Sequence, residues 1–243
     1  MFKVKVTEIE KYNDSLFRFK TEKPDTFKFI PGEFTMIGLP DTKLFRAYSM
    51  VNGPADDYLE FLSVIVQDGP LTSKLQHIKI GDEIVVAPKT TGTLLVDSLH
   101  QDRNLWMLAT GTGIAPFVSL CRDASTYVKF NRIFLCHTVR TKSDLAYYQY
   151  FLTLTTTLPM LQYYPTVTRE DFANRGRITD LIKSGAVYKT LETEELDPEK
   201  DSVMLCGGPE FNKEMIAYLT DKNWTVGSKN EPGNFVYEKA FAA

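Results

Sequence analysis

Cysteine is scarce in this chain of 243 residues. There are three cysteines, Cys121, Cys136 and Cys206, and no two of them have CxxC spacing. An odd and widely spaced set indicates neither a disulfide framework nor an iron–sulfur or zinc site. Any redox chemistry must therefore come from a bound organic cofactor.

Hydrolase signatures and membrane-like segments are also missing. The histidines are isolated from one another and from any HExxH pattern, and there is no G-x-S-x-G motif. No apolar run approaches the ~20 residues of a membrane span, and Met1–Glu8 alternates like a strand rather than a signal peptide. The net charge of −3 argues against general nucleic-acid affinity. We therefore expect a cytoplasmic protein that binds neither membranes nor nucleic acid.

The length allows two domains of ordinary size. Up to Val96, short alternating or apolar runs are separated by turn residues, a pattern typical of an antiparallel barrel or sandwich. The expected strands are Phe2–Val6, Leu16–Lys20, Phe34–Leu39, Ala47–Val51, Leu59–Val66 and Glu83–Ala87. One helix is expected at Thr72–Ile78.

After Leu99, apolar runs alternate with helical stretches, which predicts a parallel sheet of about five strands with helices on both faces. The expected strands are Leu105–Thr110, Arg132–Thr138, Tyr163–Thr168, Ser202–Cys206 and a final strand in Gly233–Ala243. The expected helices are Ala115–Ser125, Leu145–Thr156, Ile178–Lys183 and Pro209–Lys222. A polar link at residues 97–102 predicts domains at residues 1–99 and 100–243.

Two segments of the first half suggest phosphate and ring binding. Arg46–Ser49 combines a guanidinium for pyrophosphate, the flat face of Tyr48 and the hydroxyl of Ser49, which suits a flavin nucleotide. An ordinary strand with a buried tyrosine would look the same. Gly69–Ser73 begins a helix and offers backbone N–H groups to a phosphate, or it is a plain capping segment.

Two glycine turns follow strands in the second half. Gly111–Phe117 opens a helix, so its backbone can approach a pyrophosphate, although Pro116 breaks the G-x-G-x-x-G pattern. Cys206–Pro209 repeats this arrangement and is expected to lie beside it at the sheet edge. The simpler alternatives are glycines that only allow tight turns and a Cys206 that is a small buried residue.

Three arginines, Arg140, Arg169 and Arg177, lie at or near the carboxyl ends of expected strands. Because parallel strands end at one edge of a sheet, we expect these side chains to converge on a dianionic phosphate. Three solvated surface arginines are the alternative.

The order and spacing of these motifs resemble those of the ferredoxin–NADP reductases, and most closely the bacterial ferredoxin/flavodoxin reductases. The resemblance covers nearly the whole chain. It runs through Arg46–Ser49, Leu59–Val64, Asp68–Leu75, Gly111–Phe117, Val167–Glu170 with Gly176–Arg177, Leu205–Pro209 and the C-terminal tail. It implies an FAD-binding antiparallel β-barrel followed by an NADP-binding α/β domain.

The resemblance also implies roles for single residues, with no metal site. FAD would be bound by Arg46, Ala47, Tyr48, Ser49, Leu62, Ser63, Val64, Pro70, Leu71, Thr72, Ser73, Thr112, Phe241 and Ala242. NADP would be bound by Thr112, Gly113, Arg140, Thr168, Arg169, Arg177, Gly207, Gly208, Pro209 and Lys213. The reacting centre would be shaped by Ser49, Cys206 and Phe241, with Phe241 covering the flavin where the nicotinamide must stack.

The resemblance implies electron transfer between NADPH and ferredoxin or flavodoxin. We also expect the protein to be a monomer. Plant-type members often carry a Glu two positions before the terminal aromatic residue, whereas this chain has Lys239 there and Ala242–Ala243 beyond Phe241. The missing carboxylate puts a plant-type proton route in doubt. The alternatives are a reductase component of an oxygenase or other flavoprotein system, and a non-catalytic flavin or nucleotide sensor.

Overall fold

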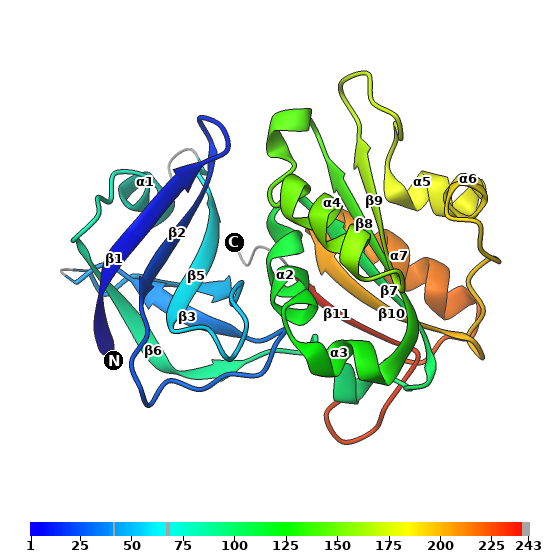
Figure 1. Ribbon diagram of the computed structural model, residues 1–243, viewed down its shortest axis with the longest axis horizontal. Coiled ribbons are helices and arrows are strands. Elements are labelled where there is room, and N and C mark those ends of the chain that lie inside the picture. Colours follow the sequence, from blue (N-terminus) through cyan, green and yellow to red (C-terminus); the bar gives the residue numbers. More distant parts are fainter. Residues whose placement is uncertain (41, 67–68, 240–243) are drawn as a thin grey trace. The chain divides into compact units, whose positions relative to one another are not determined.

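The computed structural model describes residues 1–40, 42–66 and 69–239. The chain forms two compact units, both drawn in Figure 1. Residues 1–92 and 115–123 make the first unit, and residues 93–114 with the described residues from 124 onward make the second. The first crossing between the units follows Gly92, a few residues before the predicted link at 97–102.

The first unit contains a six-stranded antiparallel sheet in the order β4-β3-β6-β1-β2-β5. Its edge strands meet, because the hydroxyl oxygens of Tyr48 on β4 and Ser63 on β5 are 3.0 Å apart, so the sheet curls into a barrel. The predicted antiparallel architecture is confirmed. The elements are β1 (Phe2–Lys11), β2 (Leu16–Glu22), β3 (Phe34–Gly38), β4 (Phe45–Ser49), β5 (Tyr58–Val64), α1 (Thr72–Leu75), β6 (Glu83–Thr91) and α2 (Ala115–Cys121).

The second unit contains a five-stranded parallel sheet, as predicted, and its strand order is β11-β10-β7-β8-β9. Its strands are β7 (Arg103–Thr110), β8 (Phe130–Val139), β9 (Leu161–Val167), β10 (Asp201–Gly207) and β11 (Phe235–Lys239). Its α-helices are α3 (Ala124–Lys129), α4 (Tyr148–Thr157), α5 (Ile178–Lys183), α6 (Ala186–Thr190) and α7 (Pro209–Asp221). Short 3-10 turns are η1 (Val96–Ser98), η2 (Gly111–Ile114) and η3 (Lys142–Asp144).

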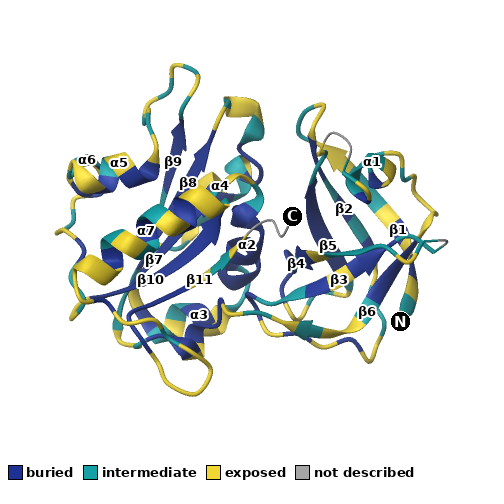
Figure 2. Ribbon diagram, turned by 180° about the vertical axis from the view of Figure 1, so that it is seen from behind, coloured by how far each residue is buried: buried dark blue, intermediate teal, exposed yellow. Residues whose placement is uncertain are grey.

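Helices cover both faces of the parallel sheet (Figures 1 and 2). On one face, Phe151 of α4 packs against Tyr163 of β9 with ring centroids 5.0 Å apart. On the other face, Phe211 of α7 belongs to a buried cluster that includes Trp106 and Phe134. The rings of Trp106 and Phe134 stack with their centroids 4.3 Å apart. Among the described residues, no helix is both long and apolar enough to cross a bilayer.

Four helical segments differ from the sequence-based expectation. Helix α1 ends at Leu75, three residues before the expected Ile78. The helix expected at residues 115–125 breaks after Cys121, and α3 begins separately at Ala124. Helix α4 begins three residues later than expected because a capped 3-10 turn precedes it and Tyr147 adopts a left-handed backbone, with φ of 60°. Helix α6, which follows a left-handed Gly185 with φ of 77°, was not expected.

Candidate functional site

The segment Arg46–Ser49 lies on β4, where alternation sends Arg46 and Tyr48 to one face and Ser49 to the other. Tyr48 is 9% exposed and shares a 3.0 Å hydrogen bond with Ser63. Burial raises the pKa of Tyr48, so its hydroxyl stays protonated. Tyr48 is therefore largely held in the core. Among the predicted residues on this strand, Arg46, Ala47 and Ser49 are exposed or partly exposed.

The other predicted flavin residues of this unit lie on β5 and before and within α1. On β5, Ser63 faces Tyr48, whereas Leu62 and Val64 lie on the opposite face. Before and within α1, Leu71 is 1% exposed and the Thr72 hydroxyl accepts the Val66 N–H at 3.2 Å. The Thr72 hydroxyl thus holds this turn together, and the turn would offer a phosphate its backbone N–H groups. Among the predicted residues of this segment, the exposed or partly exposed side chains are Pro70, Thr72 and Ser73.

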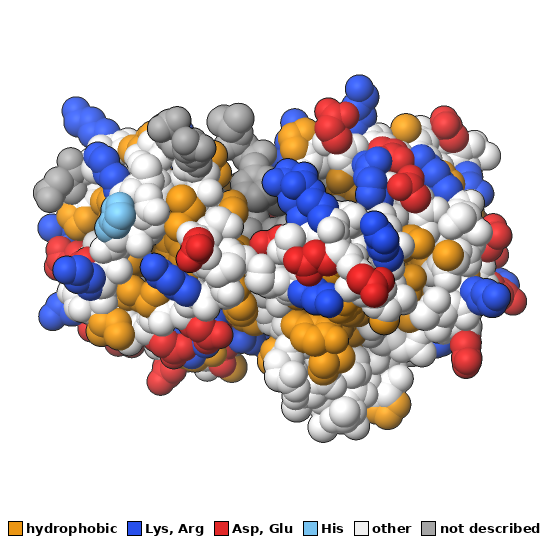
Figure 3. Space-filling model, turned by 90° about the horizontal axis from the view of Figure 1, so that it is seen from above, with side chains coloured by type: hydrophobic (Ala, Val, Ile, Leu, Met, Phe, Trp, Pro, Cys, Tyr) orange, Lys and Arg blue, Asp and Glu red, His pale blue; other side chains and the backbone are white. Residues whose placement is uncertain are grey.

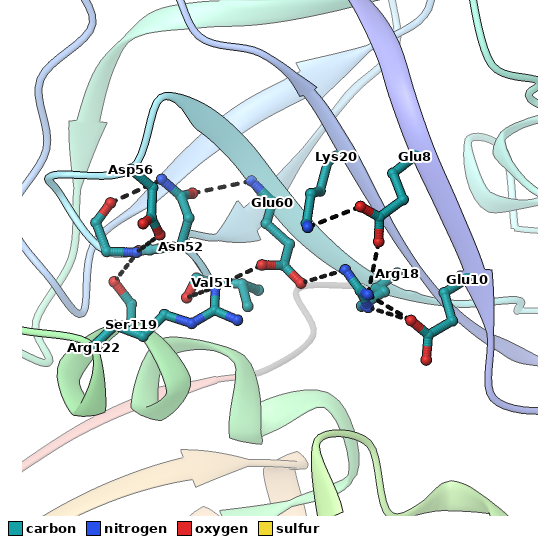
Figure 4. A network of polar contacts seen from close by, with 11 residues as sticks. Glu8, Glu10, Arg18, Lys20, Val51, Asn52, Asp56, Glu60, Ser119 and Arg122 are labelled. Atoms are coloured by element: carbon teal, nitrogen blue, oxygen red, sulfur yellow. Dashed lines mark hydrogen bonds and ion pairs between the residues drawn. The ribbon is translucent and has the colours of Figure 1, made fainter. Parts of the chain in front are cut away.

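A buried ion network lies in the first unit, and the sequence analysis missed it (Figure 4). Glu60 on β5 is fully buried, and its oxygens accept hydrogen bonds from Arg18 at 3.1 Å and from Arg122, just after α2, at 2.6 Å. The Asn52 side chain accepts the Glu60 N–H at 3.0 Å, and the Asn52 carbonyl accepts the Ser119 hydroxyl of α2 at 2.7 Å. The network ties α2 to β5 and to the loop after β4. One signal was visible in the sequence, a carboxylate inside the apolar run of β5.

In the second unit, the two glycine turns pack backbone to backbone at the carboxyl ends of β7 and β10. A Cβ atom on Gly113 would lie 2.1 Å from the carbonyl oxygen of Cys206. The Gly208 N–H donates to the Thr110 hydroxyl at 3.1 Å. The predicted adjacency of the two turns is confirmed, since β7 and β10 pair directly. Around them, Thr112, Gly208, Pro209 and Lys213 are partly or fully exposed, while Gly207 is buried.

His137 on β8 supports the first of these turns. It is fully buried, and its Nε2 atom lies 2.9 Å from the carbonyl oxygen of Gly111, whose φ is 55°. Burial lowers the pKa of His137 to about 4. At neutral pH the uncharged imidazole donates its Nε2–H to this carbonyl, which holds the entry to the turn. The sequence showed His137 only as an isolated histidine.

The backbones that carry the three predicted phosphate-binding arginines meet at one edge of the parallel sheet. The Arg169 N–H donates to the Arg140 carbonyl at 2.9 Å, and the Gly176 N–H, next to Arg177, donates to the Val167 carbonyl at 3.1 Å. All three arginine residues are exposed. Seen from above, this part of the second unit presents Lys and Arg side chains interspersed with Asp and Glu (Figure 3).

Thr168 and Arg177 are both engaged within the protein. The N–H and hydroxyl of Thr168 donate to the Val139 carbonyl at 3.0 and 3.2 Å, which joins the ends of β8 and β9. The Arg177 guanidinium donates to Glu214 of α7 at 2.8 Å. The backbones of the three arginines therefore lie close together, whereas convergence of their side chains on a phosphate stays a prediction. The Arg177 side chain is paired with a carboxylate that the sequence analysis did not anticipate.

Cys206 has a carboxylate neighbour on the terminal strand. It is 1% exposed, and burial raises the pKa of its thiol. Glu238 lies opposite Cys206 in the β10–β11 register and accepts the Thr93 N–H at 3.1 Å. Burial raises the pKa of Glu238 to about 7. Position 239 itself carries a lysine, as the sequence analysis noted, but a carboxylate lies one residue earlier, at Glu238. Phe241 and Ala242 lie outside the described residues.

Comparisons with known proteins agree with this division of the chain. The oxidoreductase FAD-binding domain family matches residues 2–92, and the oxidoreductase NAD-binding domain family matches residues 107–217. The flavodoxin/ferredoxin–NADP reductase of Rhodobacter capsulatus is 43% identical, with 97% of this chain and 92% of that protein aligned. The ferredoxin–NADP reductase of Azotobacter vinelandii is 41% identical, with 98% and 96% aligned. A structure of a ferredoxin NADP⁺ reductase from Neisseria gonorrhoeae with bound FAD and NADP superimposes with a TM-score of 0.93 at 28% identity, covering 99% of this chain and 98% of that one.

Proposed function

Because this chain belongs to the ferredoxin–NADP reductase family, we propose that it is an FAD-dependent oxidoreductase that moves electrons between NADPH and a one-electron carrier, ferredoxin or flavodoxin. The observation that carries this proposal is the presence in one chain of both an FAD-binding and an NAD-binding oxidoreductase domain. We assign FAD to the domain within residues 1–99 and NADP to the domain within residues 100–243.

The first unit has the chemistry that FAD requires. Arg46 supplies a guanidinium for the pyrophosphate, and Ser49 supplies a hydroxyl on the other face of the same strand. In the turn Pro70–Ser73, Leu71 and Thr72 would supply backbone N–H groups for the phosphates, since the Ser73 N–H donates to the Gly69 carbonyl at 3.0 Å. Tyr48 would meet the isoalloxazine through the 9% of its surface that stays exposed, held in place by its hydrogen bond to Ser63.

The second unit has the chemistry that NADP requires. A side chain at Gly113 would collide with the backbone of Cys206, and one at Gly207 would collide with the side chains of Thr110 and Phe211. This close packing supports a role for Thr112, Gly208 and Pro209 at the adjoining edge. Arg140 and Arg169 lie on loops joined by a backbone hydrogen bond and supply positive charge for the 2′-phosphate.

When bound, FAD supplies the ability to accept two electrons as hydride and to pass them on singly. The residues of this chain position the reactants and control nearby protons. The Cys206 thiol stays protonated because burial raises its pKa, so it brings a neutral side chain to the reacting centre. Glu238 can hold or release a proton near neutral pH. Neutral His137 fixes the backbone of Gly111.

The proposed carrier is small and protein-based, and the chain would act in the cytoplasm as a monomer. The test begins with the visible absorption spectrum of the purified protein, which should show bound flavin. Anaerobic NADPH should bleach this spectrum, and oxidised ferredoxin or flavodoxin should then restore it. A protein without flavin, or a flavin that NADPH does not bleach, would refute the proposal and favour a non-catalytic sensor.

A further inference from the structure

The strongest unexplained feature of the nucleotide-binding unit is a carboxylate shared by two cations. Glu214 on α7 accepts a hydrogen bond from Nη2 of Arg177 at 2.8 Å and another from Nζ of Lys183 at 2.6 Å. Arg177 precedes α5 and Lys183 is its last residue, so both ends of one short helix converge on Glu214. Each carboxylate oxygen thus serves a different cation.

The ion pair between Arg177 and Glu214 lies next to the proposed phosphate site. Val167, the last residue of β9, forms a β-bridge with Arg175, and its carbonyl accepts the Gly176 N–H. Arg177 follows this segment directly and therefore lies near the end of β9. Arg169, two residues beyond Val167, is bonded through its N–H to Arg140. The Arg177 side chain is 53% exposed and belongs to this cationic edge, yet its guanidinium is directed to Glu214.

A carboxylate and a phosphate compete for the same guanidinium, because both use its planar set of N–H donors. Glu214 has a second partner that stays with it when the first leaves, since Lys183 occupies its other oxygen. Lys183 therefore lowers the cost of releasing Arg177. A nucleotide without a 2′-phosphate offers nothing that would draw Arg177 away.

We propose that Glu214 is a positioning residue that limits the selectivity for 2′-phosphorylated nucleotides: it holds Arg177 until a 2′-phosphate takes that arginine over, while Lys183 continues to balance the charge of Glu214. This inference rests on the proposed function and goes beyond it, because it assigns a role to a carboxylate that does not touch the phosphate. Glu214 weakens binding of the 2′-phosphorylated nucleotide and leaves binding of the unphosphorylated one unchanged.

The test uses the FAD-loaded protein and two nucleotide fragments, 2′-phospho-AMP and 5′-AMP, titrated by calorimetry. Exposed ion pairs shift equilibria by about two- to fivefold, so Glu214→Gln should tighten 2′-phospho-AMP binding by about that factor and leave 5′-AMP unchanged. Lys183→Ala should weaken 2′-phospho-AMP binding. Without Lys183, Glu214 would hold Arg177 more strongly, so the phosphate would compete less well for that guanidinium. In steady state, Glu214→Gln should lower KM for NADPH without changing kcat.

Two variants separate this role from a general charge effect. Asp221→Asn removes the same charge from the exposed end of α7, about 10 Å along the helix from Glu214, and should leave 2′-phospho-AMP binding unchanged. In an Arg177→Ala background, Glu214→Gln should have no further effect. Tightening that persists without Arg177, or no tightening in the single variant, overturns the inference. Equal binding of both fragments by the unaltered protein would instead reject the NADP assignment itself.

Discussion

The buried network around Glu60 leads to a quantitative prediction for the stability of the first unit. The change is Glu60→Gln, which keeps the shape of the side chain and removes its charge. Glu60 has no exposed surface, while the side chains of Arg18 and Arg122 are only 16% and 19% exposed. The substitution leaves two largely buried guanidinium groups facing a neutral amide.

Removing one partner of a buried ion pair costs about 3–5 kcal/mol, because the remaining charge loses its compensation. Both arginines retain some contact with water, and Arg18 also pairs with Glu8 and Glu10. The lower end of that range therefore applies, and we expect a loss of about 3 kcal/mol. With an m-value of about 2 kcal/mol per M, the urea midpoint should fall by roughly 1.5 M.

Urea unfolding with saturating FAD measures this effect, because flavin release reports on the FAD-binding unit and excess ligand keeps its contribution constant. Both tryptophans, Trp106 and Trp224, are buried in the second unit, so their fluorescence follows that unit separately. The matched control is Glu10→Gln, because Glu10 pairs with the same Arg18 but its side chain is 49% exposed. This control should cost less than about 1 kcal/mol.

The result that would refute this reasoning is a flavin-release midpoint that falls no further in Glu60→Gln than in Glu10→Gln. Such a result would mean that the pair is no better shielded from water than an ordinary surface ion pair.

Three further predictions concern the second unit. Because the folded-state pKa of His137 is about 4 and its ordinary value is 6.5, the protein should lose stability as pH falls from 6.5 to 4, by up to about 3 kcal/mol for this group. Unfolding midpoints measured across that range should become flatter in His137→Gln, and an unchanged slope would contradict this assignment. Glu238 should keep its proton up to about pH 7, so a protonated-carboxyl infrared band should disappear as pH rises through neutrality and be absent in Glu238→Gln. Gly113→Ala should destabilise the turn, because its Cβ would meet the Cys206 carbonyl, whereas the Cβ of Gly208→Ala would meet no other protein atom and should leave the thermal stability unchanged. Thermal unfolding of the two alanine variants would expose an error if both behave alike.

Much of the fold followed from local pattern. Alternating side chains predicted the strands of the first unit, and apolar runs followed by glycine turns predicted β7 and β10, with helix α5 found at the expected residues. The errors in the helices arose at caps and left-handed residues such as Tyr147, where a single backbone angle decides the start of a helix. Periodicity carries little information on such angles.

For the candidate site, the sequence alone determined which residues carry suitable chemistry: the Arg46–Ser49 strand, the glycine turns and the arginines at strand ends. Only the tertiary structure decided what those residues touch. Glu60 meets Arg122 across 62 positions, Thr93 meets Glu238 across 145, and Arg177 meets Glu214 across 37. Burial and hydrogen bonding set the charge of His137 and Glu238, and both depend on neighbours that are distant in the chain. The sequence gives the type and order of the residues directly, whereas pKa values and ion pairs depend on which distant residues pack together in the folded chain.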